Sequence, residues 1–191
     1  LVSAQWCDGA GFDNVLGGAL AARRLLEAGH TRIGCISGDG REGSANRRRR
    51  GFADVLEQAG VPLESMLDVA GDYRFDGGYA ATAAMVDNGA TAVFCCNDLM
   101  AMGLLRGLRE RGLSVPADMS VIGYDNIMER FGMQTEVTTV EQDVAQLARA
   151  AWELLSARIG APGEGHPWLA EPRTRVLAPC LVDKGSVRDL R

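Results

Sequence analysis

Polar side chains of several kinds stand directly after four short apolar runs of the sequence. In chain order, these are Asp39 with residues 44–48, then Asp72 and Tyr73, then Asn97 and Asp98, and finally Tyr124, Asp125 and Asn126. Carboxylates and amides hydrogen-bond to hydroxyl groups, and an aromatic ring can cover the apolar face of a sugar. If the four groups meet in the fold, they predict a binding site for a small molecule rich in hydroxyl groups.

The elements that must position these side chains alternate between strands and helices. The apolar runs predict strands over residues 32–38, 66–70, 91–96, 119–123 and 137–140, and extended chain over 174–186. Amphipathic segments predict helices over residues 13–29, 44–60, 76–89, 99–112 and 143–160. Continuously apolar strands separated by helices indicate an α/β fold, a three-layer sandwich with a parallel sheet covered on both faces. Because ligands of such sheets bind at the carboxyl ends of the strands, we expect the polar groups along one rim.

Four consecutive arginines, residues 47–50, stand inside the predicted second helix, in the segment SANRRRRGF. Successive helical residues point about 100° apart, so these four side chains cannot form one basic face. With Ser44 as the N-cap, Arg47 and Arg48 lie in the first turn, where the helix dipole disfavours a cation by about 0.3 to 1 kcal/mol. We therefore expect a compensating carboxylate or ligand to face at least one of these arginines.

The composition argues against several classes of protein. A net charge of −5 and a pI of about 5.1 disfavour a phosphate-binding surface. No apolar run approaches the roughly 18 to 20 residues of a membrane span. Five cysteines without a CxxC motif and two distant histidines indicate buried thiols in the cytoplasm, with no metal or cofactor. A Walker loop, a GxSxG motif and a nucleophile paired with a base are all missing, so we do not expect an enzyme.

Five motifs in a fixed order together resemble one known family. They are DNVLGGALAARRLLEAGHTRIGCISG, RRRRGFADVLEQAGV, GDYRFDGGYAA, TAVFCCNDLMAMGLLRGLRERGLSVPADMSVIGYDN and VTTVEQD. Over about residues 12–186, the chain is similar to the core of the LacI/GalR family of bacterial transcription regulators. The resemblance implies a periplasmic-binding-protein-like fold of type I, in which an effector binds between two α/β subdomains.

The resemblance also implies which residues bind the effector. Carried over position by position, the family's effector-binding residues match Arg48, Asn97, Asp125, Tyr73, Gln142 and Phe12. The family pattern thus selects Arg48 among the four arginines and leaves Arg47, Arg49 and Arg50 for solvent or a partner. Purely structural roles compete with these assignments, since Asn97 stands where a helix cap is expected and Asp98 where a carboxylate faces a helix dipole.

The resemblance further predicts the domain organisation. Residues 13–141 with the tail 177–191 correspond to a complete C-terminal effector-binding subdomain, and residues 1–12 and 142–176 to a remnant of the N-terminal subdomain. The helix-turn-helix DNA-binding domain of the family is expected outside this sequence. The implied partners are a small-molecule effector, which is a sugar or sugar derivative, operator DNA contacted through that headpiece, and a second copy in a homodimer.

Three functions stay open at this point. In a regulator, the effector shifts the population of subdomain arrangements and thereby changes how a dimer presents its headpieces to DNA. A periplasmic sugar-binding protein of the same fold is the first alternative, and a signal peptide upstream would mark it. The second alternative is an enzyme or a phosphoacceptor domain that uses Asp125. The cationic Arg48 also leaves anionic effectors open.

Overall fold

The computed structural model describes residues 7–39, 43–128, 136–159 and 171–191. Contacts between residues divide the chain into two compact units. Unit 1 consists of Leu1–Asp13 and Gln142–Pro179, and unit 2 consists of Asn14–Glu141 and Cys180–Arg191. Within the described part of the chain, no helix is both long and apolar enough to cross a membrane.

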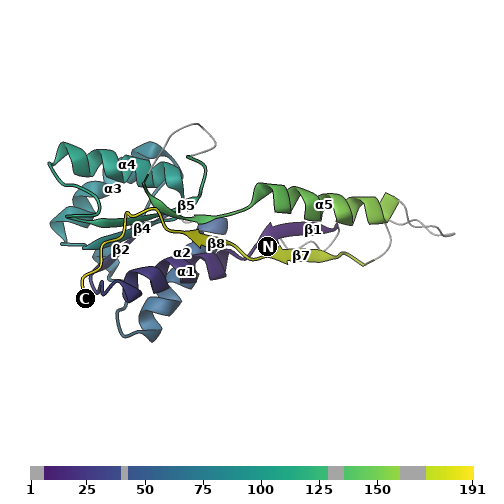
Figure 1. Ribbon diagram of the computed structural model, residues 1–191, viewed down its shortest axis with the longest axis horizontal. Helices are drawn as coiled ribbons and strands as arrows, with labels where there is room; N and C mark the ends of the chain where they lie inside the picture. The colour runs from purple at the N-terminus through teal and green to yellow at the C-terminus, as the bar shows by residue number, and fades with distance from the viewer. Residues whose placement is uncertain (1–6, 40–42, 129–135, 160–170) are drawn as a thin grey trace. The chain divides into compact units, whose positions relative to one another are not determined.

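Unit 2 is built on a six-stranded sheet (Figure 1). In spatial order the strands are β3 (Asp68–Ala70), β2 (Ile33–Ser37), β4 (Ala92–Cys95), β5 (Ser120–Asp125), β6 (Thr138–Glu141) and β8 (Cys180–Val182). The first five strands run parallel, and β8 pairs with β6 in the antiparallel direction. The parallel sheet predicted from the continuously apolar runs is therefore confirmed.

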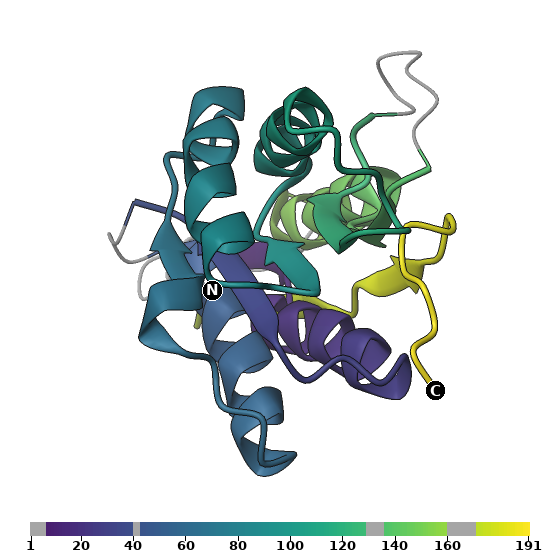
Figure 2. The same cartoon turned by 90° about the vertical axis from the view of Figure 1, so that its left-hand side faces the viewer.

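Two pairs of helices cover this sheet, one pair on each face (Figure 2). Helices α1 (Asn14–Glu27) and α2 (Ser44–Gln58) pack against each other on one face, and helices α3 (Phe75–Asp87) and α4 (Asp98–Glu110) on the other. A short 3₁₀ helix, η1 (Ser65–Leu67), precedes β3. Helices on both faces explain why the central strands are apolar throughout, because neither face of the sheet meets water.

Aromatic side chains fill the core between the sheet and helices α1 and α2. Phe52 of α2 stacks on Phe94 of β4 with a centroid distance of 4.8 Å. Tyr124 of β5 lies 6.4 Å from Phe94, and all three side chains are fully buried. Burying an aromatic side chain contributes roughly 1.5 to 3 kcal/mol, so this cluster is a main source of stability for the α2–β4–β5 region.

Helices α1 and α2 touch each other through two glycines. A Cβ atom placed on Gly18 would lie 1.8 Å from the carbonyl oxygen of Arg48. A Cβ atom on Gly51 would lie 1.9 Å from the carbonyl oxygen of Val15. Because real Cβ atoms do not approach backbone this closely, the observed crossing requires glycine at both positions.

The boundaries of two elements differ from the sequence prediction. Helix α2 has Gly43 as its N-cap, with no side-chain cap, so Ser44 is the first helical residue and not the cap. Glycine is tolerated as an N-cap because its extended backbone leaves the first helical amides open to water. The predicted strand over residues 66–70 is shortened to β3, because its first part forms η1.

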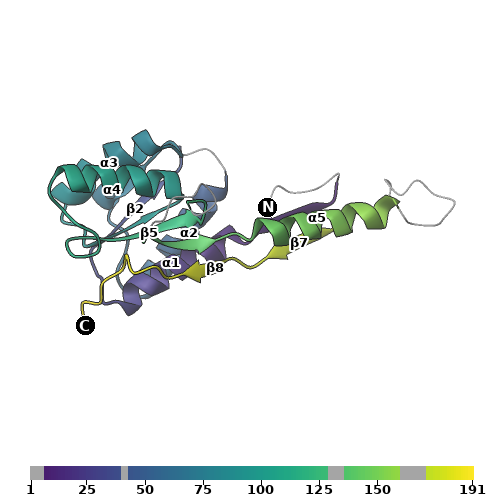
Figure 3. The ribbon, with the colours of Figure 1, turned by 45° about the horizontal axis from the view of Figure 1, so that its top comes forward.

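Unit 1 contains two strands and one helix. Strand β1 (Gly9–Phe12) pairs in parallel with β7 (Thr174–Leu177), and α5 (Val144–Ile159) packs against β1. Arg158 of α5 donates from Nε to Asp8 Oδ2 at 2.9 Å and from Nη2 to Asp8 Oδ1 at 2.5 Å. This bidentate ion pair joins the end of α5 to the start of β1. Figure 3 shows the ribbon of α5 beside β1 and β7.

Candidate functional site

A buried guanidinium stands at the centre of the candidate site in unit 2. Arg48 projects from α2 and is 7% exposed. Its Nε donates to Asn14 Oδ1 at 2.8 Å, and its Nη1 donates to the carbonyl oxygen of Cys96 at 2.6 Å. Its Nη2 lies 3.1 Å from Asp125 Oδ1, and its central carbon lies 3.7 Å from the centroid of the Tyr124 ring. Residues of α1, of β5 and of the segment directly after β4 thus contact one side chain.

The surroundings of Arg48 balance its charge. Removing a guanidinium from water costs several kcal/mol unless an anion and further acceptors replace the hydration. The Asp125 carboxylate supplies the anion, and the ring of Tyr124 supplies a cation–π contact. The compensating carboxylate that the position of the arginines predicted is therefore Asp125. These contacts hold the guanidinium of Arg48 in one orientation.

A second pair of predicted residues lies together at the start of α4. Asn97 accepts a hydrogen bond from the Met100 amide at 2.9 Å, which confirms its role as the N-cap. Its side-chain amide also donates to the carbonyl oxygen of Tyr73 at 2.9 Å. Tyr73 has a φ of 65°, a strained value for a non-glycine residue. The hydroxyl of Tyr73 packs directly on Gly38, where a Cβ atom would lie 2.1 Å from it.

A buried carboxylate follows this pair along the chain. Asp98 is 3% exposed, accepts from the Thr139 hydroxyl at 2.8 Å and accepts from the Ile127 amide at 2.9 Å. Burial raises the pKa of Asp98 to about 6, although the hydrogen bonds from Thr139 and Ile127 act in the opposite direction. The sequence predicted only an interaction with the helix dipole, because Thr139 is 41 residues away along the chain.

The model of one protein family matches residues 22–187, most of the chain, and is described as a periplasmic binding protein-like domain. A structure of a LacI family transcriptional regulator from Enterococcus faecium with bound ribose has a TM-score of 0.86 and 32% identity, over 99% of this chain and 68% of that one. The chain belongs to the LacI family of transcriptional regulators. The fold and the family predicted from the five motifs are thereby confirmed.

Curated relatives of this LacI-family chain are named as repressors. The ribose operon repressor of Haemophilus influenzae is 33% identical over 94% of this chain and 53% of the relative. The transcriptional repressor PurR of Yersinia pestis is 38% identical over 93% of this chain and 51% of the relative. The chain therefore spans about half the length of these curated relatives.

The LacI-family site residues predicted from the sequence fall into both units. Unit 2 brings Arg48 together with Asp125, and Asn97 together with Tyr73. Phe12 and Gln142 belong to unit 1, where Phe12 is the buried last residue of β1 and pairs with Leu177. Gln142 is half-buried and directly follows β6. Ligand contacts by these two residues stay a prediction.

One contact of Arg48 was missed by the sequence analysis. Asn14 stands at the start of α1, where a helix cap is expected, and its side-chain oxygen accepts from Arg48. No local pattern in the sequence indicates this contact, because its partner is 34 residues away. Arg49, which was predicted to face solvent or a partner, instead forms an ion pair with Asp68 at the start of β3.

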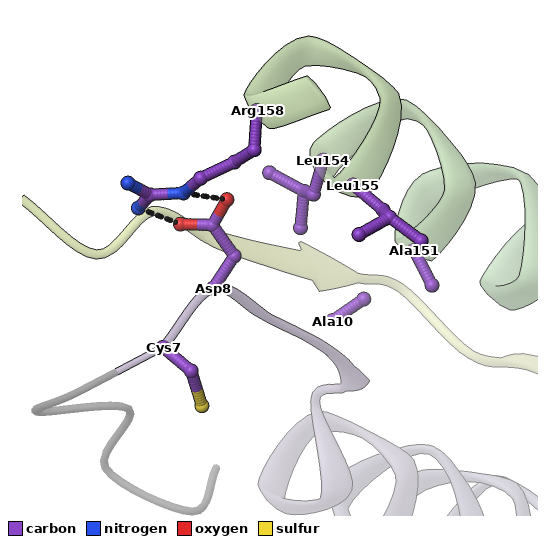
Figure 4. Close-up of a pocket in the computed structure, with 7 residues that line it drawn as sticks. All are labelled: Cys7, Asp8, Ala10, Ala151, Leu154, Leu155 and Arg158. Atoms are coloured by element: carbon purple, nitrogen blue, oxygen red, sulfur yellow. Dashed lines mark hydrogen bonds and ion pairs between the residues drawn. The ribbon is translucent and has the colours of Figure 1, made fainter. Parts of the chain in front are cut away.

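Unit 1 has a cavity of about 270 Å³ (Figure 4). The ion pair between Asp8 and Arg158 forms its polar side, and its apolar wall consists of Ala10, Ala151, Leu154 and Leu155. Hydrogen bonds from Arg158 and Arg173 hold the pKa of Asp8 well below its usual range. The carboxylate of Asp8 is thus ionised and paired with both arginines. None of the six predicted ligand-binding residues lines this cavity.

Metal binding has no support in the described ranges. No group of three or more histidine, cysteine, aspartate or glutamate side chains there is arranged to hold a metal ion. The buried thiols of Cys35, Cys95 and Cys96 lie in the core. Burial raises the pKa of the Cys95 thiol, which favours the protonated and unreactive form.

Proposed function

We propose that this chain is the effector-binding core of a LacI-type transcriptional regulator. In this proposal, a sugar or sugar derivative binds beside Arg48 and Asp125 and changes the affinity of the whole protein for operator DNA. The observation that carries the proposal is the buried guanidinium of Arg48, oriented by Asn14, Asp125 and the ring of Tyr124. Such a fixed donor, next to a half-exposed carboxylate, suits hydroxyl groups, which both donate and accept hydrogen bonds.

The comparisons support a sugar as the ligand class. The Enterococcus faecium regulator, which matches nearly the whole of this chain, carries bound ribose. The ligand-binding residues proposed here are Arg48, Asn97, Asp125 and Tyr73 of unit 2, together with Phe12 and Gln142 of unit 1. We assign unit 2 to the C-terminal subdomain of the family and unit 1 to part of the N-terminal one.

The proposed mechanism is a shift between conformations without catalysis. A ligand that binds one arrangement of the regulator more tightly raises the population of that arrangement by its difference in binding free energy. Operator DNA is contacted through a helix-turn-helix domain, so the protein acts in the cytoplasm. The names of the relatives, which are repressors, favour this function over a periplasmic binding protein and over an enzyme.

A homodimer completes the proposal, with helices α3 and α4 as its contact face. Phe75 and Tyr79 of α3 and Leu99 of α4 are 39%, 40% and 40% exposed, and α3 and α4 pack against each other. Apolar side chains exposed on neighbouring helices are candidates for a protein interface. A groove of about 500 Å³ between α4 and the following loop adds apolar surface from Leu105 and Val115. A second copy of the same face would bury this surface symmetrically.

Isothermal titration calorimetry of the protein against ribose and a panel of neutral sugars, sugar phosphates and purines tests the proposal. Arg48→Ala should abolish binding of the ligand that the wild type binds. Arg50→Ala is the matched control, because Arg50 lies on the same helix but is exposed and forms an ion pair with Asp54 one turn along. A ligand that leaves the operator affinity of the full-length regulator unchanged contradicts the regulatory part of the proposal.

A further inference from the structure

The carboxylate of Asp98 is connected to a strained turn at the end of β5. Asp125 and Asn126 have φ values of 99° and 52°, so two consecutive non-glycine residues adopt the left-handed region. Such strain persists only where the surrounding structure compensates for it, and it is concentrated at functional sites. The compensating contacts therefore show what holds Asp125 in its position beside Arg48.

The backbone amides of Asn126 and Ile127, which follow Asp125, are both connected to Asp98 by hydrogen bonds. The Ile127 amide donates to Asp98 Oδ2 at 2.9 Å. The Asn126 amide donates to the Thr139 hydroxyl oxygen at 3.4 Å, and that hydroxyl donates in turn to Asp98 Oδ1 at 2.8 Å. Asp98 is thus linked to the turn directly through Ile127 and indirectly through Thr139, and it also accepts a backbone hydrogen bond from Tyr124 of β5.

The carboxylate also fits closely against the strand that carries the turn. A Cβ atom on Gly123 of β5 would lie 2.3 Å from Asp98 Oδ1. The side chain of Asn126 is fixed separately, since it donates to Glu141 Oε1 at 3.1 Å and accepts from Lys184 Nζ at 2.8 Å. Glu141 and Lys184 thus fix the side chain of Asn126. Asp98, in contrast, fixes the backbone amides of the turn.

We propose that Asp98 is a positioning residue of the ligand site, which holds the Asp125–Asn126 turn so that the carboxylate of Asp125 faces Arg48. The part of this inference that concerns ligand affinity rests on the proposed function. The part that concerns the turn does not, because it follows from hydrogen bonds that exist without a ligand. Asp98 does not need to touch the ligand to act in this way.

The ionisation of Asp98 makes its role measurable. The charges of Asp125 at the end of β5 and of Asp98 repel each other, Asp98 also disfavours ionisation of the Cys95 thiol of β4, and Asp125 is itself paired with Arg48. Ionised Asp98 makes charge-assisted hydrogen bonds, which are roughly twice as strong as neutral ones. Protonation near pH 6 weakens both links to the turn, and Asp98→Asn imitates this neutral form with nearly the same shape.

Amide signals of the protein test the positioning role without any ligand. In the wild type, the amide proton of Ile127 should shift with a midpoint near pH 6, because it donates to the titrating carboxylate. In Asp98→Asn this shift should vanish, and the amides of Asn126 and Ile127 should exchange with solvent about tenfold faster. Asp76→Asn is the matched control, since Asp76 is also in the first turn of a helix but is exposed.

A flat Ile127 signal in the wild type, or unchanged exchange of both amides in Asp98→Asn, overturns the proposal. If Asp98→Asn does not fold, the wild-type titration and Thr139→Val, which removes only the indirect link, still decide it. In calorimetry against ribose or whichever panel member binds, Asp98→Asn should bind about tenfold more weakly at about pH 7.5, with the difference closing toward about pH 5. Equal affinities overturn the proposal, whereas a wild type that binds no panel member refutes the proposed function and leaves the amide test decisive.

Discussion

Nη2 of Arg48 lies 3.1 Å from Oδ1 of Asp125, so an ion pair joins helix α2 to the end of strand β5. The arginine is 9% exposed in its side chain and the aspartate 26%, so water screens this pair only partly. The pair therefore serves two purposes in the folded chain. It neutralises a cation that burial would otherwise destabilise, and it fixes the direction of both side chains before any ligand arrives.

Replacing Arg48 should reduce stability as well as ligand binding. Arg48→Ala leaves the carbonyl of Cys96 and the carboxylate of Asp125 without this donor, and we expect a loss of about 2 to 3 kcal/mol in the free energy of unfolding. Urea denaturation measures this loss. Arg50→Ala should stay within about 0.5 kcal/mol of the wild type, because its partner Asp54 is half-exposed. Equal losses for both variants contradict the central role of Arg48.

Two substitutions at Asn97 should separate its two roles. Asn97→Ser keeps an oxygen that can cap α4, so it should cost less than Asn97→Ala, for which we expect about 1 to 2 kcal/mol in urea denaturation. Both variants lose the donor to the Tyr73 carbonyl, so both should weaken ligand binding to a similar extent. Ligand affinity that follows stability across the two variants would show that Asn97 acts only as a cap.

Acidification should destabilise the fold through His30. This fully buried ring is within 3.0 Å of the Thr91 hydroxyl at Nδ1 and within 2.9 Å of the Ser120 hydroxyl at Nε2, and burial lowers its pKa from 6.5. The unfolded chain therefore binds a proton below about pH 6.5 that the folded chain resists, and stability falls as the pH decreases.

The contribution of His30 to the pH dependence of stability has to be measured as a difference between the wild type and a variant. The reason is that Asp98 changes the free energy of unfolding with pH in the opposite direction. The raised pKa of Asp98 makes the folded state bind a proton more readily than the unfolded state between pH 3.8 and about 6. His30→Gln should flatten the loss of unfolding free energy below pH 6.5 relative to the wild type. Parallel pH profiles for the two proteins would show that His30 does not contribute.

Charged substitutions on the α3–α4 face should dissociate the proposed dimer. Leu99→Glu replaces an exposed apolar side chain of this face by a carboxylate, and sedimentation equilibrium should show at least a tenfold weaker association, corresponding to about 1.4 kcal/mol. Met66→Glu is the control, since Met66 is 51% exposed but lies in η1. A wild-type chain that stays monomeric at high concentration contradicts the proposed interface.

Much of the fold follows from local patterns in the sequence. The apolar runs 91–96 and 119–123 gave β4 and β5 to within two residues at each end, because strands buried on both faces have no polar positions to confuse the pattern. The N-cap of α4 was also predictable, since Asn97 acts within its own turn. The cap of α2 was not, because Gly43 offers no side chain to recognise.

The candidate site was predictable only in part, because its contacts join distant segments. Asn97 and Asp125 were candidates because ligands bind at the carboxyl ends of parallel strands, and the structure places β4 and β5 next to each other. The choice of Arg48 among four arginines came from the family resemblance, since helical periodicity leaves that choice open. The roles of Asn14 and Asp98 depend on partners in α2 and β6, and no local pattern in the sequence indicates such pairs.

The backbone of Arg48 abuts Gly18, and this contact limits how such a protein can evolve. With no room for even one methyl group between the two helices, the starting point of the arginine side chain cannot drift. A lineage that acquires a new ligand must keep this crossing and vary the side chains that surround the guanidinium. We therefore expect related proteins with different ligands to keep Gly18 and Arg48 and to differ in the side chains around the guanidinium.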